Sequence, residues 1–317
     1  MTENYCEFSI IIPSRNRCDT LSQVLRALEA QTFPKSRFEA IVINDASTDN
    51  TTEFLSDFKK YTTLNLLVLQ GSATTAGAAR NLGLQKARGR RIVFLDADTI
   101  PQKDLLVQHM IWHDHFGDFS CICGYVAMSE KLDKTGQGRT NDTTTKYDLH
   151  QIFEMMWQDY RTANTSISKD LCRRVGGFDA DLPAAEDTEF ASRLQKLGVR
   201  FLFVRDIEVV HHHPMNYDGF MQKGEMYGRA VAHWYGKAPE LRHMLTSRYG
   251  VYAPELALKR KVKHLLRHLF VNPLTVPLLS IAGRVCRSIW FELSEQLYKC
   301  VFRYHVRRSF RTSLKNI

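Results

Sequence analysis

The sequence has no long hydrophobic run and no apolar leader at its start. Residues 1–7 are polar, and the apolar run that follows, Phe8 to Ile12, is short and interrupted by Ser9. In the C-terminal region the longest uncharged stretch, Leu269–Gly283, contains Pro273 and Pro277 and is shorter than the ~20 apolar residues that a membrane-spanning helix needs. We therefore expect neither a secretory leader nor a simple transmembrane helix.

The cysteines do not form the pattern of a disulfide framework. The seven cysteines are scattered, and Cys121 and Cys123 have no second Cys or His pair that would complete a zinc site. The glycine fingerprints of dinucleotide sites and P-loops are also missing. Scattered cysteines fit a reducing compartment. We expect a cytoplasmic protein, with peripheral attachment to the inner face of the cytoplasmic membrane as an open alternative.

Acidic residues are rare at the C-terminal end. Residues 251–317 carry 13 Lys and Arg against three Asp and Glu, so this region holds the whole excess charge of a chain whose net charge is +9. Such a tail suggests an anionic lipid surface or nucleic acid, and a solvated helical appendage is the alternative. No aromatic and basic platform for single strands is present, so we expect no nucleic-acid partner.

What the sequence does contain is an alternation of short apolar strands and helices over its first hundred residues. The strands are too continuously apolar to have one wet face, which is typical of a parallel sheet covered by helices on both sides. The first predicted helix has an apolar face formed by leucine and valine at helical spacing. The predicted strands are Phe8–Ile12, Glu39–Ile43, Leu64–Leu69 and Ile92–Leu95.

Polar groups follow several of these strands, where ligands collect in an open α/β sheet. Arg15 follows the first strand, Asp45 the second, and Asp96 and Asp98 the fourth. Alternation along an extended chain would point the last two carboxylates to one side. Burying both there is costly unless a cation lies between them, so the pair suggests a divalent metal that holds a diphosphate. The alternative is a solvated turn in which Asp98 caps a helix starting near Pro101.

Two further features are open to two interpretations each. Small residues around Gly77 could let the backbone approach an anion, or could simply permit close helix packing. The polar stretch 125–151 could be a mobile flap on the acceptor side, or a surface insertion.

Four motifs follow one another along the chain: Ile11–Arg17, Asn44–Thr51, Ala79–Gly83 and Asp96–Asp98. Together they resemble the family 2 glycosyltransferases of the GT-A fold, over roughly residues 6–215. The resemblance implies an α/β nucleotide-binding fold with a mainly parallel sheet, to which we expect a helical, basic C-terminal extension to be added. It also implies inverting, metal-dependent transfer of a sugar from a nucleotide-diphosphate donor, a UDP-sugar by the family pattern, to an acceptor hydroxyl of a glycan or lipid-linked glycan.

The resemblance extends to Glu186 and Asp187, which open a predicted helix after Phe178 and Asp179, and to a histidine after that helix. It implies that Asp187, with Glu186, is the general base. It implies that Mn²⁺ or Mg²⁺ is bound by Asp98 and a histidine. On a strand, His211 and His213 share one side, so either could be that ligand. The residues expected to bind the nucleotide sugar are Pro13, Arg15, Asp45, Gly77, Arg80 and Asp96.

The domains expected are a catalytic domain over residues 1–215 and a helical region over 216–317, with helices between Tyr217 and Gly250. Apolar residues from Val285 to Tyr304 fall at helical spacing opposite a charged face, which suits one helix lying in a membrane interface near the basic cluster at 259–263. Packing of that helix on the protein is the alternative. Rival functions are a metal-dependent sugar nucleotidyltransferase and a non-catalytic membrane-associated scaffold.

Overall fold

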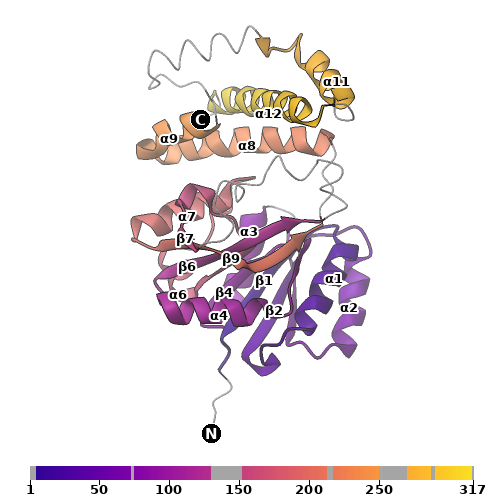
Figure 1. The fold of residues 1–317 in the computed structure, drawn as a ribbon, viewed down its shortest axis with the longest axis vertical. Coiled ribbons are helices and arrows are strands. Elements are labelled where there is room, and N and C mark those ends of the chain that lie inside the picture. The colour runs from indigo at the N-terminus through magenta and orange to yellow at the C-terminus, as the bar shows by residue number, and fades with distance from the viewer. Residues whose placement is uncertain are drawn as a thin grey trace. The chain divides into compact units, whose positions relative to one another are not determined.

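The computed structural model describes residues 5–72, 75–129, 152–212, 217–249, 251, 270–286 and 290–315 (Figure 1). The chain divides into two compact units, which are described separately. The α/β unit comprises Met1–Glu130, Asp142–Asp181 and Glu186–His213. The helical unit comprises Lys131–Asn141, Leu182–Ala185 and Pro214–Ile317.

The α/β unit is built on one sheet with the strand order β3-β2-β1-β4-β8-β6-β9-β5, and β7 pairs with β9. The pairs β3–β2, β2–β1, β1–β4 and β6–β9 are parallel, whereas β8, β5 and β7 run antiparallel to their neighbours. The expected mainly parallel α/β fold is therefore confirmed, with antiparallel strands that the sequence pattern does not indicate. The strands are β1 (Phe8–Ser14), β2 (Phe38–Asn44), β3 (Leu66–Gln70), β4 (Arg91–Leu95), β5 (Thr99–Pro101), β6 (Ser120–Met128), β7 (Phe153–Glu154), β8 (Asn164–Ser168) and β9 (Arg200–His211).

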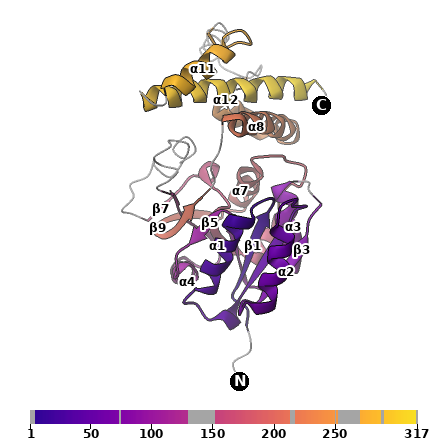
Figure 2. The same ribbon diagram turned by 90° about the vertical axis from the view of Figure 1, so that its right-hand side faces the viewer.

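Helices cover both faces of the sheet (Figures 1 and 2). Ile10 and Ile12 of β1 face a core shared with α1, α2 and α4, whereas Ile11 faces a second core shared with α3, α6 and α7. Alternate side chains of the central strands are thus buried on opposite sides, which explains their continuous apolar character. The helices are α1 (Cys18–Glu29), α2 (Thr51–Tyr61), α3 (Ala76–Lys86), α4 (Leu105–Phe116), α6 (Lys169–Arg174) and α7 (Glu186–Lys196), with 3-10 turns at Lys35–Arg37 and Trp157–Asp159.

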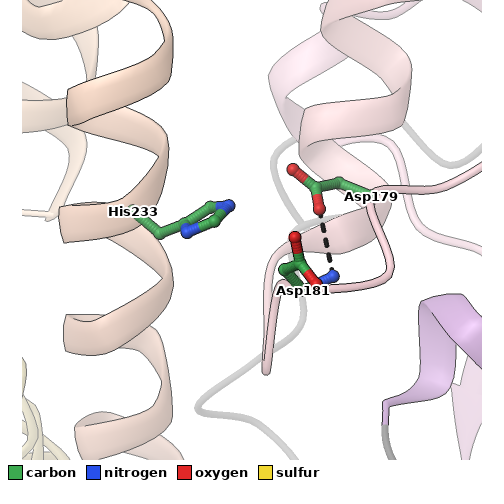
Figure 3. A group of neighbouring side chains, drawn as sticks. All are labelled: Asp179, Asp181 and His233. Atoms are coloured by element: carbon green, nitrogen blue, oxygen red, sulfur yellow. Dashed lines mark hydrogen bonds between the residues drawn. The ribbon is translucent and has the colours of Figure 1, made fainter.

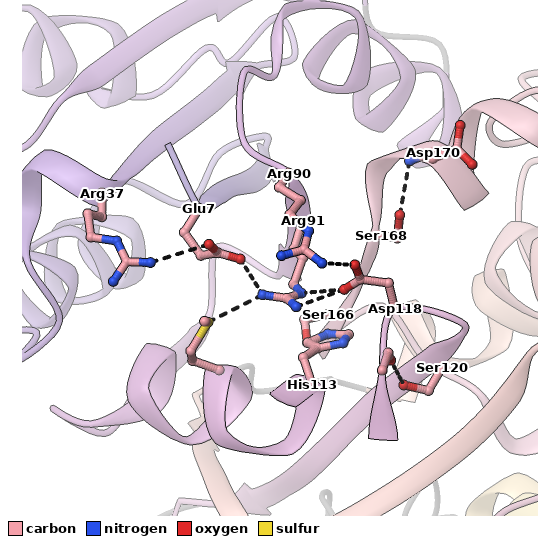
Figure 4. A network of polar contacts seen from close by, with 12 residues as sticks. Glu7, Arg37, Arg90, Arg91, His113, Asp118, Ser120, Ser166, Ser168 and Asp170 are labelled. Atoms are coloured by element: carbon pink, nitrogen blue, oxygen red, sulfur yellow. Dashed lines mark hydrogen bonds and ion pairs between the residues drawn. The ribbon is translucent and has the colours of Figure 1, made fainter. Parts of the chain in front are cut away.

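Buried charge ties together the edge of the sheet where β4 begins (Figure 4). Arg91 is only 2% exposed, and its guanidinium binds Glu7 on one side and Asp118 on the other. Arg37 also binds Glu7, and Arg90 also binds Asp118. Breaking one partner of such a buried pair leaves an uncompensated charge. The network therefore fixes this edge, away from the carboxyl ends of β1, β2 and β4.

Two histidines of α4 are buried beside this network. His113 Nε2 and His109 Nδ1 each lie 2.8 Å from Ser166 Oγ, and His109 Nε2 lies 3.2 Å from Asn164 Oδ1. Burial lowers the pKa of His109 to about 4. Burial and the nearby Arg91 charge lower the pKa of His113 to about 3. Both rings are therefore neutral in the folded protein at neutral pH.

We predict that acid destabilises the α/β unit through these rings. Their folded pKa values lie below the unfolded value of about 6.5, so the unfolded chain takes up protons first. The contribution of these neutral rings to the free energy of unfolding is fully present above about pH 6.5. It is lost progressively as the pH falls toward the pKa values of the folded protein. At pH 5 the loss is about 2 kcal/mol for each ring. Urea unfolding at pH 7.5 and 5.0 measures it. A His113→Gln variant should lose less stability between these two pH values, and a variant of the exposed His243 should behave as wild type.

The helical unit contains α8 (Tyr217–Lys237), α9 (Arg242–Tyr249), α11 (Val276–Cys286) and α12 (Phe291–Leu314), with a 3-10 turn at Pro239–Leu241. Glycines of α8 allow α12 to approach closely, since a Cβ at Gly228 would lie 2.5 Å from the carbonyl oxygen of Val306. Val301 and Phe310 of α12 are fully buried. Helices between 217 and 250 are thus confirmed. No described helix is both long and apolar enough to cross a membrane.

The single helix expected over 285–304 is wrong. Val285 and Cys286 end α11, and α12 begins at Phe291. The apolar residue Val301 of that predicted face is part of the unit's interior. The reason is that helical spacing of apolar residues is the same for a membrane-facing and a protein-facing helix. The basic cluster at 259–263 and residues 130–151 of the expected flap lie outside the described residues, and residues 125–128 belong to β6.

Candidate active site

The two carboxylates after β4 lie in a tight turn and not in an extended strand. Thr99 closes the turn, because its backbone N–H and its hydroxyl donate to the Asp96 carbonyl oxygen at 3.2 and 2.8 Å. Alternation holds only for extended backbone, so it does not apply to Asp96 and Asp98. Each carboxylate has its own partners. The proposed cap by Asp98 is also wrong, because α4 begins at Leu105 and Asp104 holds the cap position.

Arg80 links two of the predicted site carboxylates. It lies on α3, is 4% exposed, and donates from Nη2 to Asp96 Oδ1 at 3.0 Å and from Nη1 to Glu186 Oε1 at 2.7 Å. Its guanidinium also lies 5.6 Å from the ring centre of Phe178. One cation thus joins the end of β4 to the start of α7. The structure brings together Arg80, Asp96 and Glu186 from three segments far apart in the sequence.

The charges in this group perturb one another. Burial raises the pKa of Glu186; the Arg80 charge opposes that rise, and the Asp187 charge adds to it. Burial lowers the pKa of Arg80, but Asp96, Glu186 and Asp187 together raise it by more, so the net direction is upward. Arg80 is consequently a fixed cation. The net direction of the Glu186 pKa shift is upward.

Asp187 lies beside Glu186 in the first turn of α7. Its Oδ1 accepts from the Thr188 backbone N–H at 2.7 Å, and its Oδ2 lies 3.9 Å from Arg161 Nε. The positive end of the helix dipole favours a carboxylate at this position. One oxygen is therefore held by the helix start. The other faces a cation across a distance that a direct hydrogen bond does not span.

Asp98 lies between a cation and an imidazole. Its Oδ2 is 3.4 Å from Arg17 Nε, and its Oδ1 is 3.4 Å from His211 Nε2. The pairing of β5 with β9 places Thr99 opposite His211, and the His212 backbone N–H donates to the Asp98 carbonyl oxygen at 2.8 Å. The predicted Asp98 and His211 are thus brought together. His213 lies outside the described residues.

This pair suits a divalent ion. Ligand atoms that each bind one Mg²⁺ at about 2.1 Å lie about 3 Å apart when adjacent in an octahedron, close to the observed 3.4 Å between Asp98 Oδ1 and His211 Nε2. Carboxylate oxygen and imidazole nitrogen are both accepted by Mn²⁺. Arg17 is not among the predicted site residues. The sequence feature that could have identified Arg17 is its position in the turn after β1, two residues beyond the exposed Arg15.

The turns after β1 and β2 are bound to each other. Asn16 Oδ1 accepts from the Thr48 backbone N–H at 2.7 Å, and Asp49 Oδ2 accepts from the Cys18 N–H at 3.2 Å. Asn16 and Ala46 both have φ of +53°, a region that costs non-glycine residues energy. These turns therefore form one braced edge at the carboxyl ends of the strands.

Asp45 is buried at that edge, directly after β2, and its backbone N–H donates to the Ser14 carbonyl oxygen at 2.8 Å. A Cβ at Gly71 would lie only 2.3 Å from Asp45 Oδ1, so the glycine gives this carboxylate its room. Pro13 is half-buried within β1. The positions of Pro13 and Asp45 at the ends of neighbouring strands agree with the expected nucleotide edge.

Gly77 lies inside the first turn of α3 and packs closely on the protein. A Cβ there would lie 3.0 Å from the Asp179 carbonyl oxygen and 3.2 Å from Phe178 Cβ. Nearby, Asn81 accepts from the Phe178 N–H and donates to the Phe178 carbonyl oxygen, both at 2.8 Å. These contacts favour the packing interpretation of Gly77. They also show how α3 fixes the segment that leads to α7.

That segment carries two carboxylates that the predicted site does not include (Figure 3). The Asp181 backbone N–H donates to Asp179 Oδ1 at 3.0 Å, which closes a small turn. Thr75, which caps α3, donates to the Ala180 carbonyl oxygen at 2.8 Å. His233, drawn in the same figure, belongs to α8 of the helical unit. The turn is thus a second acidic element on the side of α3.

Comparison with protein families gives two matches. A family model described as glycosyl transferase family 2 matches residues 9–171, and one described as glycosyl transferase family group 2 matches residues 91–302. The glycosyltransferase AglE of Haloferax volcanii is 27% identical over 67% of this chain and 68% of its own length. The poly(ribitol-phosphate) β-N-acetylglucosaminyltransferase TarS of Staphylococcus aureus is 32% identical over 32% of this chain, which spans only 18% of TarS.

Solved structures share the fold. The mannosyltransferase PcManGT of Pyrobaculum calidifontis, in complex with GDP-Man and Mn²⁺, aligns over 98% of this chain and 88% of its own, with a TM-score of 0.65 and 18% identity. S. aureus TarS 1–349 in complex with UDP-GlcNAc aligns over 98% of this chain and 91% of its own, with a TM-score of 0.55 and 18% identity. Both are GT-A glycosyltransferases, and this chain has their fold.

Proposed function

The chain belongs to glycosyl transferase family 2 and is a glycosyltransferase, and from this premise we propose that it transfers a sugar, with inversion, from a UDP-sugar to an acceptor hydroxyl. The observation that carries the proposal is the convergence of Asp96, Glu186 and Asp187 around Arg80, beside Asp98 and His211. Membership of the family removes the nucleotidyltransferase and scaffold alternatives.

The nucleotide is proposed to lie at the braced edge formed by the turns after β1 and β2. Asp45, buried there, offers a carboxylate to the imide N–H of uracil, and Pro13 and Arg15 flank the base. Asp96, which is one-third exposed beside Arg80, is placed to accept from a ribose hydroxyl. Buried carboxylates that accept from a neutral N–H or O–H give specificity, because a ligand without the donor leaves them unpaired.

Asp98 and His211 are proposed to hold Mn²⁺ or Mg²⁺, which would neutralise the charge of the departing diphosphate. Arg17, 3.4 Å from Asp98 Oδ2, is a second cation on the same side and can approach a phosphate oxygen. Gly77 contributes to the donor site indirectly, because its close packing fixes where α3 begins. Arg80 is the cation that orders Asp96 and Glu186.

Asp187 is proposed to be the general base. As the acceptor oxygen bonds to the anomeric carbon, its proton passes to the Asp187 carboxylate, and the bond from that carbon to the nucleoside diphosphate breaks. The Thr188 backbone N–H holds Asp187 Oδ1 and leaves Oδ2 to approach an acceptor hydroxyl. Glu186, held by Arg80, positions the first turn of α7. The acceptor proposed is a glycan or a lipid-linked glycan.

The test is release of nucleoside diphosphate from a panel of nucleotide sugars, each offered with Mn²⁺, Mg²⁺ or EDTA. We expect UDP from at least one UDP-sugar, with an acceptor-dependent product of inverted configuration. Release of pyrophosphate, or no turnover of any nucleotide sugar with glycan and lipid-linked acceptors, would contradict the proposal.

We predict that Asp98→Ala abolishes the metal-dependent part of donor binding. Titration calorimetry with UDP should show an affinity in Mn²⁺ that falls at least about tenfold in the variant and no longer responds to EDTA. Asp114→Ala, on the outer side of α4, is the matched control and should bind as wild type. Equal binding by Asp98→Ala and wild type, with and without EDTA, would remove Asp98 from the metal site.

A further inference from the structure

The helical unit presents an exposed apolar stripe along α11. Leu274, Leu278, Ile281 and Val285 are 85%, 67%, 58% and 56% exposed. Their spacing of four, three and four residues places them within one narrow sector of a helix, and Leu274 lies just before the first turn. We call these four residues the α11 stripe. Phe270 before the stripe and Trp290 after it are also mostly exposed.

The stripe faces away from the rest of the helical unit. The opposite side of α11 carries Gly283, where a Cβ would lie 2.7 Å from the ring of Tyr298 on α12. Ser294 of α12 donates to the Gly283 carbonyl oxygen at 2.8 Å. At 100° per residue, Gly283 is about 160° around the helix from both Ile281 and Val285. α11 lies beside α12 (Figures 1 and 2). The packing that fixes α11 on α12 therefore leaves the stripe exposed.

The charge of the region that carries the stripe favours an anionic partner. Arg284 is exposed on α11 itself, next to Val285, and its Nη2 lies 3.9 Å from the exposed carboxylate of Asp218 on α8. The sequence from 251 to 317 carries a net charge of +10. An apolar stripe with an aromatic residue at its end, in a region of net positive charge, matches the boundary between acyl chains and anionic headgroups. A purely apolar protein partner would not require the cations.

We propose that the α11 stripe docks this protein onto an anionic lipid bilayer, with α11 lying in the plane of the surface. A helix of 11 residues rises about 16 Å, half of the hydrocarbon thickness, which suits burial along its side. The proposal deepens the proposed function by naming the surface through which the enzyme meets a lipid-linked acceptor. It places the membrane contact on α11, not on the buried face of α12.

The experiment is co-sedimentation of the full chain with vesicles of phosphatidylglycerol and phosphatidylcholine mixed, and of phosphatidylcholine alone. Wild type should bind the anionic vesicles, and more weakly as salt is raised. Leu278→Glu with Ile281→Glu should weaken this binding by about tenfold or more, because both side chains leave the acyl region. The matched control is Tyr61→Glu with Ile111→Glu, two exposed apolar residues of the α/β unit, which should bind as wild type.

The outcomes separate this proposal from that of sugar transfer. UDP binding by calorimetry should be the same in wild type and both double variants, so lost vesicle binding with retained UDP binding supports docking alone. Failure of wild type to bind anionic vesicles overturns docking, whatever the nucleotide assays show. Equal vesicle binding by the α11 variant overturns the role of the stripe. A wild-type dimer that becomes a monomer in that variant would show a second copy as the occupant and also overturn the proposal.

Discussion

Asp187→Asn is expected to reduce kcat/KM for sugar transfer by about 10²–10⁴-fold, the usual contribution of a general base. The amide is isosteric, and its oxygen can still accept from the Thr188 N–H, so α7 should begin unchanged. What is lost is the negative charge that takes the acceptor proton. Because no part of the nucleotide is proposed to touch this residue, the donor Kd should change by less than about twofold.

The measurement is initial rates of UDP release with acceptor, together with calorimetric titration of UDP. Asp170→Asn serves as control, since this carboxylate is exposed and pairs with Arg174 on α6. Its activity should equal that of wild type. Full transfer by Asp187→Asn would assign the base elsewhere. Lost UDP binding in a normally folded variant would instead place Asp187 in the donor site.

Arg80→Met is expected to cost about 3 kcal/mol of stability as well as activity, because it leaves the largely buried Glu186 and the one-third exposed Asp96 without their cation. Arg80 binds Asp96 and Glu186 at once, and burial already raises the pKa of Glu186. Without Arg80 that pKa rises further. A carboxyl whose pKa is raised in the folded state binds its proton before the unfolded chain does. The deficit of the variant should therefore shrink as pH falls from 7.5 to 5.

Urea unfolding at both pH values measures this deficit. A double-mutant cycle with Glu186→Gln isolates the coupling, since removing both charges should cost less than the sum of the single changes. Arg174→Met is the control, because its pair with Asp170 is exposed and worth at most about 1 kcal/mol. A deficit for Arg80→Met no larger than that of this control, at both pH values, would refute the role of Arg80 as the buried cation.

Much of the α/β unit was predictable because its strands have a simple signal. β1, β2 and β4 are buried on both faces, so their sequences are continuously apolar, and the polar residues at their ends stand out against them. This is why Asp45, Asp96 and Asp98 could be named from the sequence. The motif Ala79–Gly83 could likewise be placed on a helix after a strand.

The remaining parts depend on contacts between distant residues. Antiparallel β5, for example, is three residues long, and only its pairing with β9 brings His211 to Asp98. Arg17 adjoins the same carboxylate from the turn after β1. The alternation of an extended strand does not apply to Asp96 and Asp98, because Thr99 closes a turn there. The sequence did not predict the α11 stripe, because the spacing of apolar residues does not show which of two successive helices packs its apolar face against the protein.

The positive φ angles of Asn16 and Ala46 carry unequal costs. Asparagine adopts this region readily, whereas an alanine held at φ of +53° raises the energy of the folded state by about 1 kcal/mol. Glycine at position 46 would relieve that cost, but it would also give the unfolded chain more conformations, and the two effects oppose each other. Ala46→Gly should therefore change the free energy of unfolding by less than the backbone strain at this turn.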